Sequence, residues 1–108
     1  MSYKISTISL FDKQAKRLAK KYPSLKRDLS ELIDSLVNDP RQGDALGNGF
    51  YKIRMPITSK GQGKSGGARV ITYVKVTATT VFLTSVYDKS EKSTITDVEL
   101  QQIFRLVP

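Results

Sequence analysis

Residues 50–75 read FYKIRMPITSKGQGKSGGARVITYVK, two strand-like segments joined by a glycine-rich loop. Four of the ten residues from Lys60 to Arg69 are glycine, a composition that favours a loop over regular structure. Apolar and polar residues alternate on both sides of this loop, as in strands with one buried face. The stretch has no acidic residue, and its basic residues are Lys52, Arg54, Lys60, Lys64, Arg69 and Lys75. A basic loop between two basic strands is typical of a surface that binds a polyanion such as RNA.

The charge of the chain is concentrated around this stretch. The 108 residues carry a formal net charge of +8 at pH 7. No acidic residue lies between Asp44 and Asp88, whereas residues 1–49 mix nine basic with six acidic side chains. A positive net charge alone is compatible with an inert basic surface, but its concentration in one segment favours an anionic partner.

The chain contains no cysteine and no histidine. The absence of cysteine excludes disulfides, thiolate catalysis and thiolate metal sites. The absence of histidine removes the usual general acid–base residue near neutral pH and the commonest metal ligand. A metal site would need clustered carboxylates, but Asp28, Glu31 and Asp34 are expected to be solvated charges on a helix. We therefore expect neither a metal nor a cofactor.

The length of the chain is that of one domain, which we assign to residues 1–108. The N-terminus shows no charged-then-apolar signal pattern. No apolar run approaches the ~18 residues that a transmembrane helix needs. We expect a soluble, cytoplasmic protein without a membrane partner.

Two helices are predicted before the basic stretch. A short strand over residues 2–8 comes first, and Ser9 is expected to cap the helix that follows. Apolar residues then recur at i, i+4, i+7, i+8 and i+11 twice, over residues 11–22 and again over residues 25–36. Pro23 between them suits the first turn of the second helix. Matched lengths and a short joint predict an antiparallel helical hairpin, zipped along the two apolar stripes.

The basic stretch itself is predicted to form two strands of a sheet. Residues 41–49, with three glycines, are expected to be a connecting loop. A strand over residues 51–55 places Lys52 and Arg54 on one face, about 7 Å apart at the usual rise per residue. A further strand is predicted over residues 68–76, after the glycine-rich loop.

The C-terminal part completes the predicted fold. Residues 81–87 are apolar on both faces and are predicted to form the central strand. After a charged turn, Thr96 and Glu99 have the spacing of a capping box, which predicts a C-terminal helix. This order predicts an α+β fold, with an N-terminal strand and an antiparallel helical hairpin packed on an antiparallel sheet. The sheet face with Lys52 and Arg54 is expected to be open to a ligand.

With these elements placed, the chain resembles the RelE/HigB superfamily of toxins from bacterial toxin–antitoxin pairs. The resemblance rests on YKIR at residues 51–54, on KGQGKSGGARVI at residues 60–71, and on the strand over residues 81–87 with the DKSE that follows. The family pattern is a basic-x-basic strand, a glycine before an arginine that opens the next strand, and a basic cluster after the last strand. The glycine-rich form of the loop looks most like the HigB-like branch.

The resemblance implies a RelE-like fold and a ribosome-dependent mRNA interferase, an endoribonuclease that cleaves mRNA and inhibits translation without a metal. It also implies a cognate antitoxin that binds the toxin in a hetero-oligomer. By residue match, Lys52 and Arg54 correspond to the basic pair of the active site, and Arg69 to the arginine that holds the scissile phosphate. The residues expected to contact RNA or the ribosome are Lys60, Lys64, Lys75, Lys89 and Lys92.

Metal-free cleavage of RNA needs a base, an acid and cations around the developing phosphorane. Clustered cations favour the neutral form of a lysine by repulsion, so Lys52 is the candidate base. Arginine stays charged, which makes Arg54 and Arg69 candidate phosphate clamps.

The general acid is the position at which the chain departs from the RelE pattern. Ser90 stands where the RelE branch has a proposed general-acid arginine, and the C-terminal helix lacks the stacking tyrosine of that branch. Tyr87 or Tyr73 is the candidate replacement. Strand pairing is expected to bring Tyr87 near Arg69, where cations lower the pKa of a phenol. Simple packing of Tyr87 at the end of the sheet is an equally open interpretation.

Two other functions stay open at this point. A ParE-like gyrase poison shares the fold without needing a cationic nuclease site, and the presence of Lys52, Arg54 and Arg69 argues against it. A non-catalytic domain that binds RNA or the ribosome would show the same basic face, and composition does not exclude it.

Overall fold

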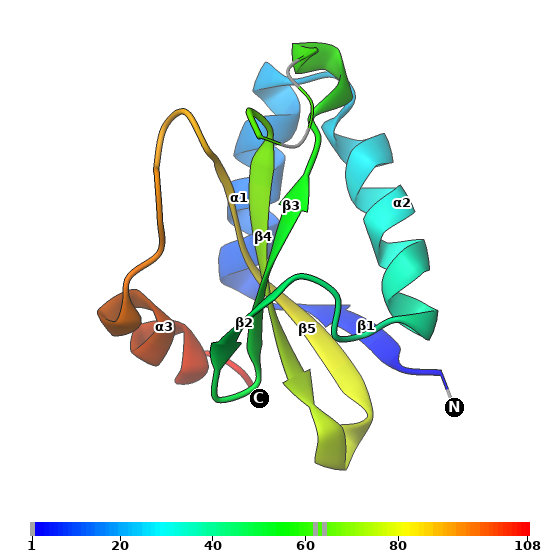
Figure 1. The fold of residues 1–108 in the computed structure, drawn as a ribbon, viewed down its shortest axis with the longest axis vertical. Coiled ribbons are helices and arrows are strands. Elements are labelled where there is room, and N and C mark those ends of the chain that lie inside the picture. The colour runs from blue at the N-terminus through cyan, green and yellow to red at the C-terminus, as the bar shows by residue number, and fades with distance from the viewer. Residues whose placement is uncertain (1, 62, 64) are drawn as a thin grey trace.

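The computed structural model describes residues 2–61, 63 and 65–108, and its element order confirms the predicted α+β fold (Figure 1). The elements are β1 (Lys4–Thr7), α1 (Ser9–Lys21), α2 (Leu25–Asn38), β2 (Asp44–Gly47), β3 (Phe50–Met55), the 3₁₀ turn η1 (Thr58–Lys60), β4 (Ala68–Lys75), the 3₁₀ turn η2 (Val76–Ala78), β5 (Thr80–Asp88) and α3 (Asp97–Phe104). Within the described residues, the helices are too short and too polar to cross a lipid bilayer.

The five strands form one sheet in the order β1-β5-β4-β3-β2. The pairs β3–β4 and β4–β5 are antiparallel, as predicted, and β2 pairs antiparallel with β3. The pair β1–β5 is parallel, so the sheet is mixed rather than wholly antiparallel. A parallel partner needs a long connection, and the chain between β1 and β5 supplies one that includes both helices of the hairpin.

Two predictions about the strands are corrected by the structure. Residues 44–47 form β2, a short edge strand paired with β3, rather than part of a loop. Glycine is depleted in strands, so a glycine-rich segment gives little strand signal. The strand over residues 81–87 is confirmed as β5, and all nine of its residues are buried. It is an inner strand, but β4 rather than β5 occupies the centre of the sheet.

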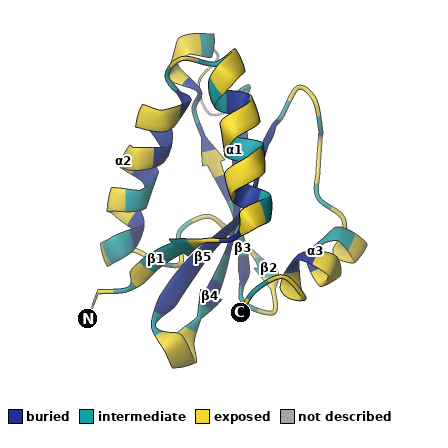
Figure 2. Ribbon diagram, turned by 180° about the vertical axis from the view of Figure 1, so that it is seen from behind, coloured by how far each residue is buried: buried dark blue, intermediate teal, exposed yellow. Residues whose placement is uncertain are grey.

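Helices α1 and α2 cover one face of the sheet, with buried sides toward the strands and exposed sides outward (Figure 2). The sequence predicts that the apolar stripes of the two helices pack against each other. In the structure they pack mainly onto the sheet. The shared core includes Leu18, Leu25 and Leu36 from the helices and Val70 and Leu83 from the strands. Burial of these stripes against a sheet removes more apolar area from water than contact between two helices alone.

The helix N-termini differ in part from the predictions. Ser9 is the first residue of α1 rather than its cap. Pro23 precedes α2, whose N-cap position is Ser24. The capping box of α3 is confirmed, because the hydroxyl of Thr96 accepts a hydrogen bond from the backbone N–H of Glu99 at 3.1 Å.

The opposite face of the sheet is only partly open. Helix α3, reached through a long segment after β5, covers one side of it (Figure 1). A second core cluster forms there from Phe50, Ile71, Tyr87, Leu100 and Ile103. The expectation of a fully open face is therefore corrected: α3 buries the strand residues nearest to it and leaves Arg54 exposed.

Candidate nucleic-acid interface

Three neighbouring strands bring Arg54, Arg69 and Tyr87 into one row across the sheet. Arg54 on β3 pairs with Arg69 on β4, and Arg69 pairs with Tyr87 on β5. Directly opposite residues have their side chains on the same face. The expectation that strand pairing places Tyr87 beside Arg69 is therefore confirmed. Lys52 lies on the same face, two residues along β3 from Arg54.

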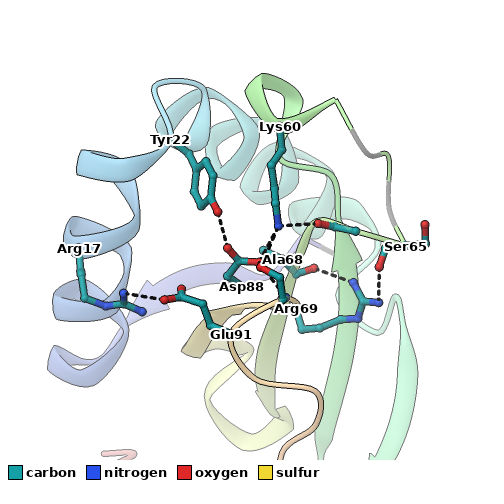
Figure 3. Close-up of polar contacts among 10 residues, drawn as sticks. Arg17, Tyr22, Lys60, Ser65, Ala68, Arg69, Asp88 and Glu91 are labelled. Carbon is teal, nitrogen blue, oxygen red and sulfur yellow. Dashed lines mark hydrogen bonds and ion pairs between the residues drawn. The ribbon is translucent and has the colours of Figure 1, made fainter.

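The pairing of Arg54 with Arg69 is unusual for a stable sheet. Like charges on directly opposite residues destabilise a pair of strands. Arg54 is exposed, whereas Arg69 is only 5% exposed. The guanidinium of Arg69 donates from Nη1 to the carbonyl of Ala68 at 3.2 Å and from Nη2 to the carbonyl of Ser65 at 3.4 Å (Figure 3). Two cations held this way favour an anion between them.

Tyr87 is 5% exposed and packs in the cluster under α3. Its hydroxyl is buried and makes no hydrogen bond within the described part of the chain. Burial raises the pKa of Tyr87, and the charge of Arg69 offsets only part of that effect. The expected lowering of this pKa by nearby cations is therefore wrong, because loss of hydration outweighs the attraction of Arg69.

Asp88 accepts several hydrogen bonds that the sequence does not predict. Its carboxylate is 0% exposed and accepts hydrogen bonds from the Tyr22 hydroxyl at 2.5 Å and the Lys60 ammonium at 2.8 Å (Figure 3). The backbone N–H and the hydroxyl of Ser90 also donate to it, at 3.0 and 2.8 Å. Burial by itself would raise the pKa of Asp88, but the hydrogen bonds from Lys60, Tyr22 and Ser90 hold it far below its usual value. The only sequence signal is that Asp88 ends the long acid-free segment.

Asp28 is a second buried carboxylate and corrects the expectation of a solvated charge. It is 6% exposed. It accepts hydrogen bonds from the backbone N–H and the hydroxyl of Thr58, at 3.0 and 2.5 Å, and from the hydroxyl of Ser24 at 2.9 Å. Since Thr58 begins η1, these bonds fix the start of the glycine-rich loop on the N-terminal end of α2. Helical periodicity does not reveal this contact, because the partner lies 30 residues away.

The other predicted RNA contacts are spread over the molecule. Lys75 lies at the far end of β4 from Arg69, and its ammonium donates to an oxygen of Pro108 at 2.8 Å. Lys89 follows β5 and donates to the carbonyl of Ser93 at 3.2 Å, while Lys92 forms an ion pair with Glu99. Lys64 lies outside the described residues. The contacts of these lysines with RNA stay predictions.

An open hollow of about 850 Å³ lies between the β2–β3 turn and α3. It contains none of the predicted basic residues. Tyr73, the alternative to Tyr87, lines it and packs against Phe50 and Phe104 at ring distances of 5.1 and 5.6 Å. Tyr73 is therefore separated from the row of Arg54, Arg69 and Tyr87. No three acidic side chains gather into a possible metal site in residues 2–61, 63 and 65–108.

Similarity to known proteins agrees with this fold. A crystal structure of the isolated E. coli RelE toxin has a TM-score of 0.62 and 18% identity, over 97% of this chain and 99% of that one. A free-state structure of an E. coli RelE mutant has a TM-score of 0.67 and 18% identity, over 99% and 100% of the two chains. At this identity the two structures establish the fold alone.

The family assignment comes from the sequence. A family model described as the RelE toxin of the RelE/RelB toxin–antitoxin system matches residues 9–107. The match covers nearly the whole chain and includes the strands that carry Arg54, Arg69 and Tyr87. The chain therefore belongs to the RelE family of toxins from toxin–antitoxin systems.

Proposed function

We propose that this toxin is a ribosome-dependent mRNA endonuclease that acts in the cytoplasm without a metal and is neutralised by its cognate antitoxin in a hetero-oligomer. The observation that carries the proposal is the pairing of Arg54 with Arg69 on adjacent strands, with Lys52 on the same face. Because such a cationic pair weakens a sheet, its presence is better explained by an anionic substrate than by the fold.

In the proposed reaction, the 2′-hydroxyl of one nucleotide attacks the neighbouring phosphorus. The P–O bond to the 5′-oxygen breaks, and that oxygen leaves with a proton. Arg54 and Arg69 hold the non-bridging oxygens as the charge on the phosphorane grows. Lys52 accepts the proton of the 2′-hydroxyl, since it lies beside Arg54 on the same face and is partly exposed.

Tyr87 is the proposed donor of the proton to the leaving oxygen. The phenol is protonated at neutral pH, as a general acid requires, and its raised pKa makes it a weaker acid than an exposed tyrosine. Its hydroxyl has no hydrogen-bond partner in the described structure, so the phenolic proton is not already donated to another protein group there. Its pairing with Arg69 across β4 and β5 supports this role, since Arg69 is the proposed phosphate ligand.

The proposed dependence on the ribosome follows because Lys52 and Tyr87 are a weak base–acid pair for this reaction. A site without histidine or metal gains most from accurate positioning of the RNA, which can lower a barrier by about 7–11 kcal/mol. The proposed ribosome and RNA contacts beyond the row are Lys64, Lys75, Lys89 and Lys92. A HigB-like origin of the loop stays a prediction.

The test is to add the protein to a translating extract and to map mRNA ends by primer extension. New ends that require both ribosomes and the toxin are expected. Arg69→Met keeps the buried stem but removes the phosphate contact, and should lower the rate on the order of 10²-fold. Cuts in DNA with gyrase, or ribosome binding without cuts, would replace the proposal by a gyrase poison or a non-catalytic binding domain.

A further inference from the structure

The glycine-rich loop is held to the end of β5 by the ion pair between Lys60 and Asp88. The Nζ atom of Lys60 lies 2.8 Å from Oδ1 of Asp88. The same Nζ donates to the carbonyl of Gly66 at 2.9 Å, near the end of the loop. We propose that Lys60 and Asp88 are positioning residues that hold this loop against Arg69, so that Lys60 acts through Arg69 and does not contact RNA. This inference rests on the proposed function, in which Arg69 binds a phosphate.

The ammonium of Lys60 has no hydrogen left for a phosphate. A lysine ammonium has three N–H donors. Besides Asp88 and Gly66, the third acceptor is the hydroxyl of Ser90 at 3.2 Å. The side chain of Lys60 is only 13% exposed. Its hydrogen bond to Asp88 raises the pKa of Lys60 in spite of burial, so the ion pair is intact at neutral pH.

The end of the loop touches both Lys60 and Arg69. The carbonyls of Ser65 and Ala68 accept hydrogen bonds from the guanidinium of Arg69. Between them, the carbonyl of Gly66 accepts from Lys60, and the carbonyl of Gly67 accepts from the backbone N–H of Lys89 at 3.0 Å. The position of the Arg69 guanidinium therefore depends on a segment that Lys60 fixes.

This segment also has little room to move toward β3. A side-chain Cβ at Gly67 would lie 2.3 Å from the carbonyl oxygen of Met55. Glycine at this position lets the loop close directly onto the end of β3. The loop is thus held between β3 on one side and the Lys60–Asp88 pair on the other.

Asp88 is itself well placed to define the position of the loop. It pairs with Ala68 across β4 and β5, one step from the pair of Arg69 with Tyr87. Its carboxylate is fixed by the hydroxyl of Tyr22 at the end of α1 as well as by Ser90. A buried carboxylate needs such partners: Lys60 supplies the counter-charge, and Tyr22 and Ser90 supply further hydrogen bonds.

The first test is a double-mutant cycle on cleavage. Lys60→Met removes the ammonium and keeps an unbranched side chain. It should lower the single-turnover cleavage rate on programmed ribosomes about 10- to 100-fold, because a displacement of about 1 Å can cost about 100-fold. In an Arg69→Met background, the same substitution should change the rate less than about twofold. Fully multiplicative effects of the two substitutions would overturn the proposal.

The second test separates positioning from RNA contact. Each contact with a phosphate of single-stranded RNA adds about 0.7 to the slope of log affinity against log salt. In the Arg69→Met background, Lys60→Met should leave this slope for ribosome binding unchanged, whereas the control Lys89→Met should reduce it by about 0.7. A reduction of that size for Lys60→Met would show a direct phosphate contact and contradict the positioning role.

The third test needs neither ribosomes nor RNA. The backbone N–H of Lys89 is bonded to the loop at Gly67, so its hydrogen exchange reports attachment of the loop. Val81→Ala, buried at the opposite end of β5, is a control for general loss of stability. Exchange at Lys89 should be about tenfold faster or more in Lys60→Met than in Val81→Ala. If the wild-type protein cuts no mRNA, the proposed function fails while this comparison still tests positioning; equal exchange in the two variants would overturn it.

Discussion

Tyr87 and Asp88 are consecutive residues at the end of β5, and their polar groups differ in how many hydrogen bonds they make. The carboxylate of Asp88 faces the helical hairpin and accepts hydrogen bonds from Tyr22, Lys60 and Ser90. The side chain of Tyr87 packs in the cluster under α3, and its hydroxyl makes no hydrogen bond within residues 2–61, 63 and 65–108. Both side chains are nearly inaccessible to water, so burial does not explain the difference.

The contrast between Tyr87 and Asp88 supports the proposed functional role of the row of Arg54, Arg69 and Tyr87. A buried charge with a full set of partners is compatible with a stable fold, whereas a buried hydroxyl without a partner costs about 1–3 kcal/mol. The face with Tyr87 also pairs Arg54 with Arg69, a second arrangement that weakens the sheet. Destabilising features that gather at one place are expected at a functional site.

Substitution of Asp88 should have the largest effect on stability. Asp88→Asn leaves the Lys60 ammonium buried without its counter-charge, and removal of one partner of a buried pair costs about 3–5 kcal/mol. Urea unfolding followed by circular dichroism measures this free energy. The control is Asp34→Asn on the exposed side of α2, which should change it by less than about 0.5 kcal/mol. Equal values for the two variants would mean that the Lys60–Asp88 pair does not stabilise the fold.

The same carboxylate should give the protein a marked sensitivity to acid. The folded-state pKa of Asp88 lies below its unfolded value of about 3.9, so its contribution is present above that pH and is lost as the pH falls further. Between about pH 5 and pH 2.5, the wild-type protein should therefore lose unfolding free energy more steeply than Asp88→Asn. A gap between the two proteins that stays constant over this range would contradict the lowered pKa.

Removal of a single donor to Asp88 should have a smaller effect. Tyr22→Phe keeps the ring, which packs against the core, and removes one hydrogen bond to a charged group, worth about 1.5–3 kcal/mol. Thermal unfolding of Tyr22→Phe and of the control Tyr3→Phe, before β1, gives the comparison. We expect a lower melting temperature for Tyr22→Phe only; an unchanged one would show that Ser90 and Lys60 suffice to hold Asp88.

The sequence predicts the parts of this fold that arise from local patterns. Periodicity predicts all three helices, alternation predicts the strand that carries Arg69, and a run that is apolar on both faces predicts the strand that carries Tyr87. The sequence does not predict the ion pair of Lys60 with Asp88 or the burial of Asp28. Both depend on how the glycine-rich loop packs against the helical hairpin. The mixed sheet is not predicted either, since a parallel pair forms between strands far apart in the chain. The raised pKa of Tyr87 follows from its cover by α3, a contact that periodicity does not locate.

The smallest expected change in stability belongs to Tyr87, and its sign is opposite to that of the other variants. Tyr87→Phe removes a buried hydroxyl without a partner in the described structure, so it should stabilise the fold by about 1 kcal/mol. If the phenol protonates the leaving oxygen, the same substitution should slow single-turnover cleavage on the order of 10²-fold while ribosome binding stays the same.

Tyr73→Phe, in the hollow beside α3, is the matched control for cleavage and should leave the rate unchanged. A stabilised Tyr87→Phe toxin with wild-type kinetics would assign Tyr87 to packing and leave Lys89 or Lys92 as the candidate acid. A slowed and more stable variant would show that the protein gives up stability at Tyr87 for catalysis. Because the two readouts move in opposite directions, loss of folding cannot produce the expected result.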